Sequence, residues 1–206
     1  MENKSINIIL IDINEKMCQE WSKYAFPDRV KIFNGSIDQL KLNGINIFVS
    51  PANSLGLMRG GIDKVYCEMF PSIEMDVRKA IHKLGLKNNQ GSIYLPVGSA
   101  LFVEVSGDCV INDLKNCKNY FICAPSMSQP GSNIKGTNNA YHCYKSIITL
   151  IKKLPVKINN VILPGIGTGV GGLTTQQCAT QLYRALTELK DPDESPKSQI
   201  LVLKSI

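Results

Sequence analysis

The residues with the clearest chemical potential lie in a glycine-rich segment near the carboxyl end of the chain. This late loop runs from residue 164 to 172 and reads Pro-Gly-Ile-Gly-Thr-Gly-Val-Gly-Gly. The apolar run Val161-Ile162-Leu163 precedes it, and an amphipathic stretch follows from near Thr174. A strand, a glycine loop and a helix start in this order present backbone N–H groups to a phosphate. The late loop therefore predicts an anion site, because closely spaced glycines cost backbone entropy that a plain connection does not need.

A second loop with similar glycines lies in the first third of the chain. This early loop spans residues 51 to 63, follows the apolar run from Ile45 to Val49, and reads Pro-Ala-Asn-Ser-Leu-Gly-Leu-Met-Arg-Gly-Gly-Ile-Asp. The Asn53 amide both donates and accepts hydrogen bonds, so it can hold a sugar diol. The Asp63 carboxylate can hold or deprotonate a water. Taken alone, Asn53 also suits a turn and Asp63 a first helical turn.

Two such loops together indicate a ligand with a phosphate portion and a sugar portion. The late loop also contains G-x-G-x-x-G at Gly167, Gly169 and Gly172, a motif of dinucleotide-binding domains. That interpretation requires an acidic residue at the end of the next strand, about 20 residues further on. The next apolar run ends in Leu-Lys-Ser-Ile and has no carboxylate, and the chain lacks G-K-[ST]. A dinucleotide-dependent oxidoreductase and a P-loop triphosphatase are therefore disfavoured.

Apolar periodicity predicts that strands and helices alternate along the chain. Strands are expected at residues 7–13, 30–33, 45–49, 119–124, 161–163 and 200–203, and two short strands with a break are expected within 92–105. Helices are expected at 14–25, 62–70, 73–84, 137–153 and 174–189, with Asn14 and Thr137 as N-caps. Residues 125–136 are interpreted as a long loop and 191–198 as a polar turn.

This alternation predicts an α/β fold with a central mixed, mostly parallel sheet and helices on both faces. We expect a single domain over residues 1–206, because no repeat, low-complexity tract or linker interrupts the pattern. Ligands of such sheets bind beyond the carboxyl ends of the strands. Both glycine loops follow strands directly, so both are expected at that edge of the sheet.

Composition and charge set limits on partners and location. The formal charge of +6 is compatible with an anionic ligand or a nucleic acid, but the lysines are scattered and no basic block indicates a nucleic-acid surface. A solvated basic surface is the simpler explanation. No apolar run approaches the roughly 20 residues of a membrane span, and no secretory signal precedes the first strand. We therefore expect a cytoplasmic protein, with the nucleus as an alternative, and no membrane partner.

The cysteines indicate reduced thiols. Seven are present, an odd number without a C-x-x-C pair, which argues against a disulfide framework and against a zinc site. Several lie inside apolar runs, as buried thiols do. We expect neither a bound metal nor a cofactor.

The early loop and its flanking elements resemble the macro domain, an ADP-ribose-binding α/β module. The resemblance rests on Pro51-Ala52-Asn53-Ser54 after a strand and on Gly60-Gly61-Ile62-Asp63 opening a helix. The late loop is similar to that family's second loop, which wraps the diphosphate and the distal ribose. The resemblance extends from about Val30 to the carboxyl end and implies a three-layer α/β/α sandwich. The first strand and helix are similar to an extra amino-terminal unit that some members carry.

The resemblance implies roles for individual residues. Asn53 would bind the distal ribose hydroxyls, Asp63 would hold or polarise a water near the anomeric carbon, and the N–H groups of residues 165–169 would bind the diphosphate. The implied catalytic pair is Asn53 and Asp63. The implied ligand-binding residues are Ser36, Ile37, Ala52, Asn53, Gly60, Gly61, Gly165, Ile166, Gly167, Thr168, Gly169 and Val170.

The chain departs from the family pattern at three positions. Pro51 stands in a segment where many members have Asn-Ala, and it has no N–H to donate. Ser36 occupies the middle of the triplet Gly35-Ser36-Ile37, where many members have an Asp that holds the adenine amine. Serine would bind that amine more weakly. Cys67 stands where some hydrolytic members have a His, so a mechanism that needs this His is not available.

Two functions follow from the resemblance. The first is hydrolysis of an ADP-ribose conjugate, either an ADP-ribosyl ester on a protein carboxylate or ADP-ribose 1″-phosphate. Asp63 would orient the attacking water, and either Asp63 or the ligand's own diphosphate would activate it. The second is a non-catalytic reader that binds ADP-ribose in the same pocket. The presence of Asp63 favours the enzyme, and the expected partner is ADP-ribose or an ADP-ribosylated molecule.

Overall fold

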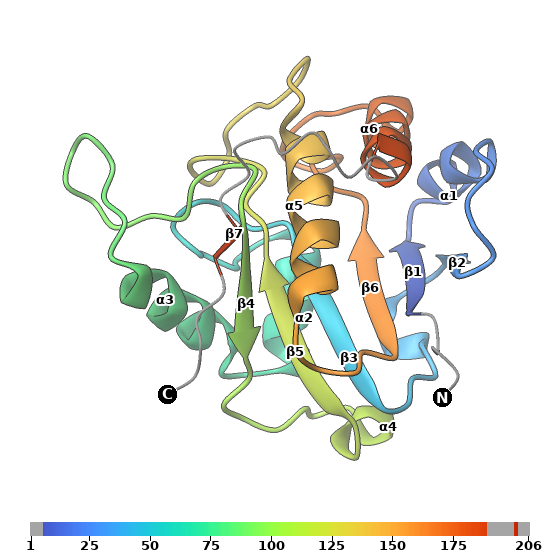
Figure 1. Ribbon diagram of the computed structural model, residues 1–206, viewed down its shortest axis with the longest axis horizontal. Helices are drawn as coiled ribbons and strands as arrows, with labels where there is room; N and C mark the ends of the chain where they lie inside the picture. Colours follow the sequence, from blue (N-terminus) through green and yellow to red (C-terminus); the bar gives the residue numbers. More distant parts are fainter. Residues whose placement is uncertain (1–5, 189–199, 202–206) are drawn as a thin grey trace.

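A single sheet organises the computed structural model, which describes residues 6–188 and 200–201. The sheet has seven strands, and their spatial order is β2-β1-β6-β3-β5-β4-β7 (Figure 1). The strands β2, β1, β6, β3 and β5 are mutually parallel, whereas β4 runs antiparallel to β5. The bounds are β1 Asn7–Asp12, β2 Val30–Asn34, β3 Ile45–Ser50, β4 Ala100–Glu104, β5 Lys118–Cys123, β6 Asn160–Pro164 and β7 Ile200–Leu201.

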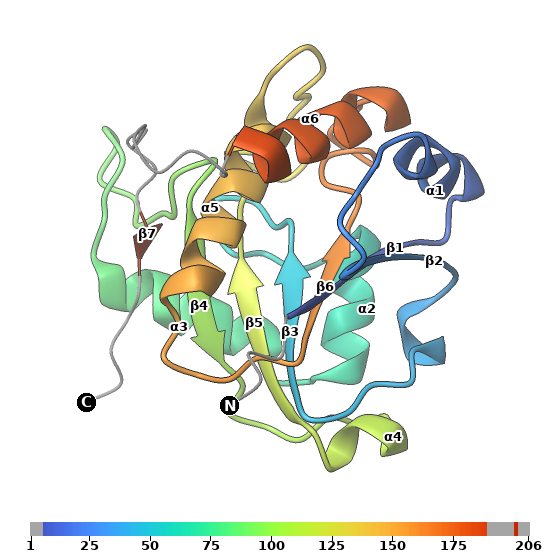
Figure 2. The ribbon, with the colours of Figure 1, turned by 45° about the vertical axis from the view of Figure 1, so that its right-hand side comes forward.

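Helices cover both faces of the sheet. The α-helices are α1 Glu15–Ser22, α2 Gly61–Met69, α3 Ile73–Leu84, α4 Asn112–Lys115, α5 Asn139–Lys153 and α6 Thr175–Glu188, and a short 3₁₀ helix spans Ile37–Gln39. The helices α1, α5 and α6 pack on one face, and α2 and α3 pack on the other (Figure 1, Figure 2). The predicted three-layer α/β/α class is therefore confirmed.

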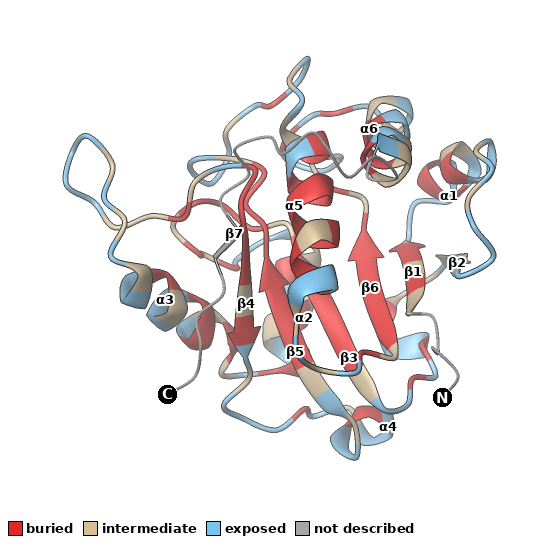
Figure 3. Ribbon diagram, viewed as in Figure 1, coloured by how far each residue is buried: buried red, intermediate tan, exposed pale blue. Residues whose placement is uncertain are grey.

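Strand alternation divides the core between the two faces. In β3, Ile47 and Val49 belong to the cluster under α1, α5 and α6, whereas Phe48 belongs to the cluster under α2 and α3. The central strands are buried along most of their length, as a sheet covered on both faces requires (Figure 3). Phe48 packs edge-on against Tyr66 of α2, with ring centroids 5.8 Å apart. This contact fixes α2 on the sheet and with it the end of the early loop.

Several predicted elements differ from the structure. Residues 92–105 contain one strand, β4, because Pro96 lacks an N–H and Gly98 adopts a φ of 79° that breaks the extended chain. The helix α5 has Asn138 at its N-cap, and the Thr137 hydroxyl instead donates to the Ile134 carbonyl at 2.7 Å. Asn14 caps α1 as predicted, accepting from the Lys16 N–H. The predicted turn at 191–198 and the end of the last predicted strand lie outside the described residues.

Among the residues that the structure describes, no helix combines the length and apolarity needed to cross a membrane.

Candidate functional site

A pocket of about 740 Å³ lies at the carboxyl edge of the five parallel strands. Its wall takes residues from the ends of β1 and β2, from the early loop, from the loop after β5 and from the late loop. Because parallel strands end at one edge of a sheet, the fold brings together segments that lie more than a hundred residues apart. The pocket therefore sits where ligands of open α/β sheets bind.

Almost the whole set of predicted site residues lies in this wall. The pocket is lined by Ser36, Ile37, Ala52, Asn53, Gly60, Gly61, Asp63, Gly165, Gly167, Thr168, Gly169 and Val170. Ile166 is the exception. Its side chain is fully buried, and its N–H donates to the hydroxyl of Tyr144 at 2.9 Å. The prediction that Ile166 offers its N–H to a phosphate is corrected accordingly, because the late loop turns this residue toward the core.

The late loop still presents unused donors to the pocket. Within the described part of the chain, the N–H groups of residues 167–171 donate no hydrogen bond, although all five residues line the pocket. Gly167 has a φ of 80°, and its carbonyl accepts from the Leu173 N–H at 3.0 Å, which closes the loop on itself. A Cβ at Gly167 would lie 2.6 Å from Ile134, so only glycine fits. Successive free N–H groups in a concave loop form an anion site.

Asp63 lies in the first turn of α2, beneath the pocket. Its side chain is 7% exposed, and the Ser50 hydroxyl donates to its Oδ1 at 2.6 Å. Burial raises the pKa of Asp63 to about 7, with a further increase from Glu74 and a decrease from the Ser50 hydrogen bond. A carboxyl group with a pKa near neutrality is suited to accept a proton from water.

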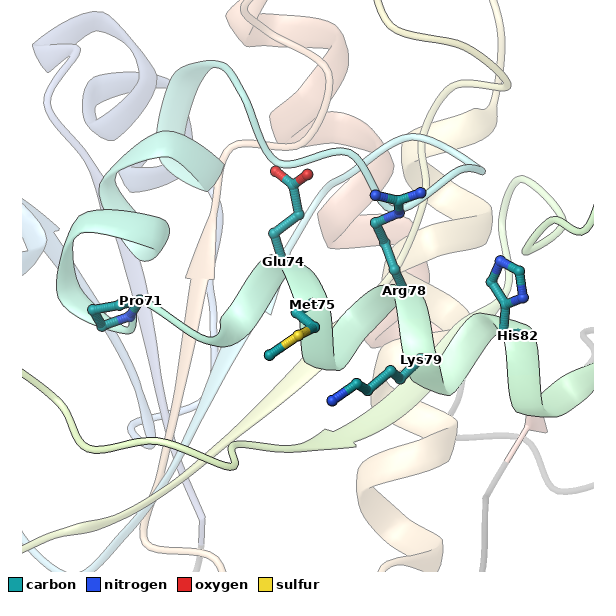
Figure 4. A pocket seen from close by; sticks show the side chains of 6 residues that line it. All are labelled: Pro71, Glu74, Met75, Arg78, Lys79 and His82. Atoms are coloured by element: carbon teal, nitrogen blue, oxygen red, sulfur yellow. The ribbon is translucent and has the colours of Figure 1, made fainter.

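Glu74 of α3 contacts two residues of the early loop. Glu74 Oε2 accepts from the Met58 N–H at 3.2 Å, and Glu74 Oε1 lies 3.9 Å from Arg59 Nε. Glu74 projects from α3 in Figure 4, which shows a second groove lined by Pro71, Glu74, Met75, Arg78, Lys79 and His82. The same residue therefore supports the loop and contributes negative charge near Asp63.

Asn53 is engaged within its own loop. Its Oδ1 accepts from the N–H groups of Leu55 at 3.1 Å and Leu57 at 3.3 Å, and its Nδ2 donates to the Leu57 carbonyl at 2.7 Å. These bonds show that Asn53 stabilises the turn of the early loop, which is the structural role that its residue type also suits. The residue also lines the pocket, and its Nδ2 carries a second N–H, so ribose binding stays a prediction.

Ser36 is also bonded locally. Its hydroxyl donates to the Asp38 carboxylate, and its N–H donates to Gln39 Oε1 at 2.9 Å. The hydroxyl oxygen retains acceptor capacity. Its contact with a nucleotide base stays a prediction.

Asp12 is a pocket residue that sequence reasoning missed. It ends β1, and its Oδ1 accepts from the Asn14 N–H at 2.9 Å. Burial raises the pKa of Asp12, while hydrogen bonds from the N–H groups of Asn14, Gly165 and Ile13 oppose the increase. Gly165 also lines the pocket, so the binding of a diphosphate by its N–H stays a prediction. The one available signal was the position of Asp12 at the carboxyl end of an apolar strand.

The cysteines of the described region are all free, and five of the seven are buried. Cys67 is half-buried, and its thiol donates to the Met58 carbonyl at 3.4 Å. Among the described residues, no group of three or more His, Cys, Asp or Glu side chains is arranged to hold a metal ion.

Comparisons with known proteins place this chain in a family. The family model for the macro domain matches residues 49–182. An uncharacterised protein of Aquifex aeolicus is 30% identical over 161 residues, which cover 78% of this chain and 82% of that protein. The chain therefore belongs to the macro domain family, which confirms the resemblance seen in the two loops.

Solved structures share the fold at low identity. The macrodomain of Mycobacterium tuberculosis DarG gives a TM-score of 0.57 at 19% identity, over 82% of this chain and 93% of that one. The Oceanobacillus iheyensis macrodomain, solved with ADP, gives 0.53 at 17% identity, over 82% and 77%. Thermosipho africanus DarTG, solved in complex with ADP-ribose, gives 0.53 at 15% identity, over 85% and 46%.

Proposed function

We propose that this protein binds ADP-ribose in the pocket and hydrolyses an ADP-ribose conjugate. The observation that carries the proposal is the run of unpartnered N–H groups at residues 167–171, which line the same pocket as the Asp63 carboxylate. A site of this kind takes an anion at the late loop and places a proton acceptor beside it. The ADP and ADP-ribose in the structures of two relatives support this ligand class.

The strand order supports an extended ligand. Adjacent strands lie about 4.8 Å apart, so the edge from β2 through β1 and β6 to β3 spans roughly 14 Å. The late loop, with its donors, follows β6 in the middle of this edge. Asp63 and Asn53 follow β3 at one end, and Ser36 follows β2 at the other. A ligand with a diphosphate between a sugar and a nucleoside matches this arrangement.

The proposed reaction is water attack on the conjugate. Asn53 would orient the distal ribose, and Asp63 would hold the water and take its proton. The water oxygen would bond to the anomeric carbon while the bond from that carbon to the ester oxygen breaks, and the carboxylate of the modified protein would leave. On ADP-ribose 1″-phosphate the same water would attack the phosphorus, the bond from phosphorus to the 1″-oxygen would break, and ADP-ribose would leave as its 1″-hydroxyl form together with inorganic phosphate. The pKa of about 7 for Asp63 supports the role, because the ionised form is then available at neutral pH.

The alternative is a reader that binds ADP-ribose without turnover. The observation that favours it is Asn53, whose amide already makes three hydrogen bonds inside the early loop. If those bonds persist with ligand present, Asn53 has only the second N–H of its Nδ2 left for the ribose, and its Oδ1 accepts no further hydrogen bond. The water would then lack a fixed target.

We also propose that residues 1–206 form one domain and that the protein acts in the cytoplasm. The continuous sheet from β2 to β7 supports the first statement. The seven free cysteines support the second, because reduced thiols are typical of that compartment. The net charge of +6 is compatible with a nucleic-acid partner, but no block of basic residues indicates one.

The test combines binding with turnover. Calorimetric titration with ADP-ribose, NAD and AMP is expected to show tight ADP-ribose binding and little NAD binding. Release of ADP-ribose from an automodified acceptor, and of phosphate from ADP-ribose 1″-phosphate, measures hydrolysis. Binding without turnover on either substrate would establish the reader. Preference for NAD over ADP-ribose would overturn both functions.

A further inference from the structure

The amino-terminal unit supplies part of the pocket wall. Ile11, Asp12 and Ile13 line the pocket, although the family model begins only at residue 49. The strand β1 lies between β2 and β6, with Asp12 opposite Asn34 and Ile11 opposite Pro164. Asp12 therefore stands between the Ser36 end of the pocket and the late loop. This position belongs to neither of the two loops that carry the family resemblance.

The carboxylate of Asp12 is fixed in place. Its Oδ1 accepts from the Asn14 N–H at 2.9 Å, and its backbone carbonyl accepts from the Gly35 N–H at 3.1 Å and from Asn34 Nδ2 at 2.9 Å. A Cβ on Gly165 would lie 2.7 Å from Asp12 Oδ2, so the carboxylate fills the space that a side chain would take. The bonds to the carbonyl hold the backbone of Asp12, and the Asn14 bond orients the carboxylate without consuming every acceptor site of its two oxygens.

The position of the Asp12 carboxylate beside an anion site restricts which chemical groups of the ligand can lie at each end of the pocket. Like charges repel at close range, so the phosphate must lie at the late loop and away from Asp12. The part of the ligand that faces Asp12 must then offer a hydrogen-bond donor. The surroundings are apolar, since Ile11, Ile13, Ile37 and Val170 also line the pocket. Ile13 is 79% exposed and Val170 68% exposed, so both side chains present apolar surface at the pocket.

An apolar surface with one acceptor suits a flat ring that carries an amine. Aliphatic side chains provide the faces for a base, and a carboxylate is the strong acceptor for an N–H donor. We propose that Asp12 reads the base of the ligand by accepting a hydrogen bond from its exocyclic amine. This inference rests on the proposed function, because it assigns the base end of the same nucleotide ligand. It places the specificity for the amine on the amino-terminal unit instead of on Ser36.

The test is a double-mutant cycle between protein and ligand. Calorimetry compares ADP-ribose with its 6-deamino analogue, in which hydrogen replaces the amine of adenine. For the unaltered protein, loss of the amine is expected to weaken binding about tenfold or more, as for a charge-assisted hydrogen bond. For Asp12→Ala, the two ligands are expected to bind within about twofold of each other, because the partner of the amine is gone.

Asp38→Ala is the matched control. It removes an exposed carboxylate from the 3₁₀ helix after β2, which does not line the pocket but accepts from Ser36. The preference for the amine is expected to survive this change. Circular dichroism and thermal melting check the fold of each variant, and Asp12→Ser, which retains an acceptor for the Asn14 N–H, is used if Asp12→Ala does not fold.

The outcomes separate the two proposals. Equal affinity of the unaltered protein for both ligands would overturn the role of Asp12 and leave ADP-ribose binding intact. The same would follow if Asp38→Ala abolished the preference while the Asp12 variants retained it, because the base would then be read through Ser36. Absence of binding to either ligand would overturn the proposed function itself and this inference with it.

Discussion

At the scale of single residues, burial gives Asp63 its chemistry. The side chain has little exposure and one hydroxyl donor, Ser50, so the ionised form is poorly solvated and its pKa rises to about 7. A solvent-exposed carboxylate in a first helical turn would remain ionised and serve mainly the helix dipole. Burial is therefore the property that makes Asp63 a potential general base, whereas an exposed Asp at the same helix position would not be one.

Replacing Asp63 distinguishes an enzyme from a reader. Asp63→Ala is expected to lower turnover by a factor on the order of a hundred or more, as for loss of a general base. Affinity for ADP-ribose is expected to change much less, because the N–H groups of the late loop remain. Release of ADP-ribose is measured beside calorimetric binding, and Asn53→Ala serves for comparison because it should reduce both turnover and affinity.

In the unaltered enzyme the rate of hydrolysis should rise as pH passes through about 7 and then level off. Full activity of Asp63→Ala would remove Asp63 from the mechanism.

The same carboxyl group is expected to affect stability. Its pKa in the folded protein, about 7, exceeds the ordinary value of 3.8 that applies when the chain is unfolded. Between about pH 4 and pH 7 the unfolded state loses the proton that the folded state keeps, so stability falls as pH rises and then stays level. The contribution is of the order of a few kcal/mol. Urea unfolding of Asp63→Asn, compared with the unaltered protein at pH 4.5 and pH 8, should show the variant gaining relative stability at the higher pH. An identical pH dependence for both proteins would show that Asp63 titrates normally.

At the scale of elements, the late loop is organised by contacts made outside itself. The Tyr144 hydroxyl of α5 accepts from the Ile166 N–H, and Ile134 packs against Gly167. These contacts direct one residue of the loop inward and leave the next five N–H groups at the pocket. The loop can therefore bind an anion because Tyr144 and Ile134 hold it in this conformation, and its glycines make the conformation accessible.

A charge placed in this loop tests the phosphate position. Gly169→Glu is expected to abolish ADP-ribose binding, because the new carboxylate would repel the diphosphate. The fold should be retained, since a Cβ at Gly169 meets no atom within 4 Å. Lys135→Glu, an exposed change outside the pocket wall, controls for altered net charge. Thermal melting is recorded for both variants. Unchanged affinity in folded Gly169→Glu would move the phosphate site away from the late loop.

At the scale of the whole molecule, the amino-terminal unit is part of the core. The strand β1 is flanked by β2 and β6, and Leu10 is paired with Ile32 on one side and Leu163 on the other. The helix α1 adds Met17 and Trp21 to the cluster shared with α5 and α6. The unit therefore stabilises the sheet as well as lining the pocket.

Core packing in β1 can be measured directly. Leu10 is fully buried, so Leu10→Ala is expected to destabilise the protein by about 2–5 kcal/mol through lost burial and the cavity left behind. Ile13, just beyond the same strand, is mostly exposed, and Ile13→Ala should change stability by less than about 0.5 kcal/mol. Urea unfolding of the two variants gives the comparison. Similar small effects at both positions would mean that β1 is only loosely attached to the sheet.

Local chemistry was enough to predict much of the fold and the site. Apolar runs located the strands, and glycines with Asn53 and Asp63 marked the loops after β3 and β6, because backbone freedom and periodicity are properties of neighbouring residues. The same pattern predicted that these loops meet at one edge of a parallel sheet. All but one of the predicted site residues consequently line the pocket.

Contacts between distant residues decided the rest. The Ile166 N–H faces Tyr144, 22 positions away in the chain, and the pairing of β1 with β6 brings Asp12 against Gly165. No local pattern specifies these pairings, because they follow from strand order and from how the helices pack. Burial likewise set the pKa of Asp63, since desolvation depends on every element that covers the residue. The sequence by itself determined which residues reach the pocket loops, and the tertiary structure decided which of their atoms remain free to act there.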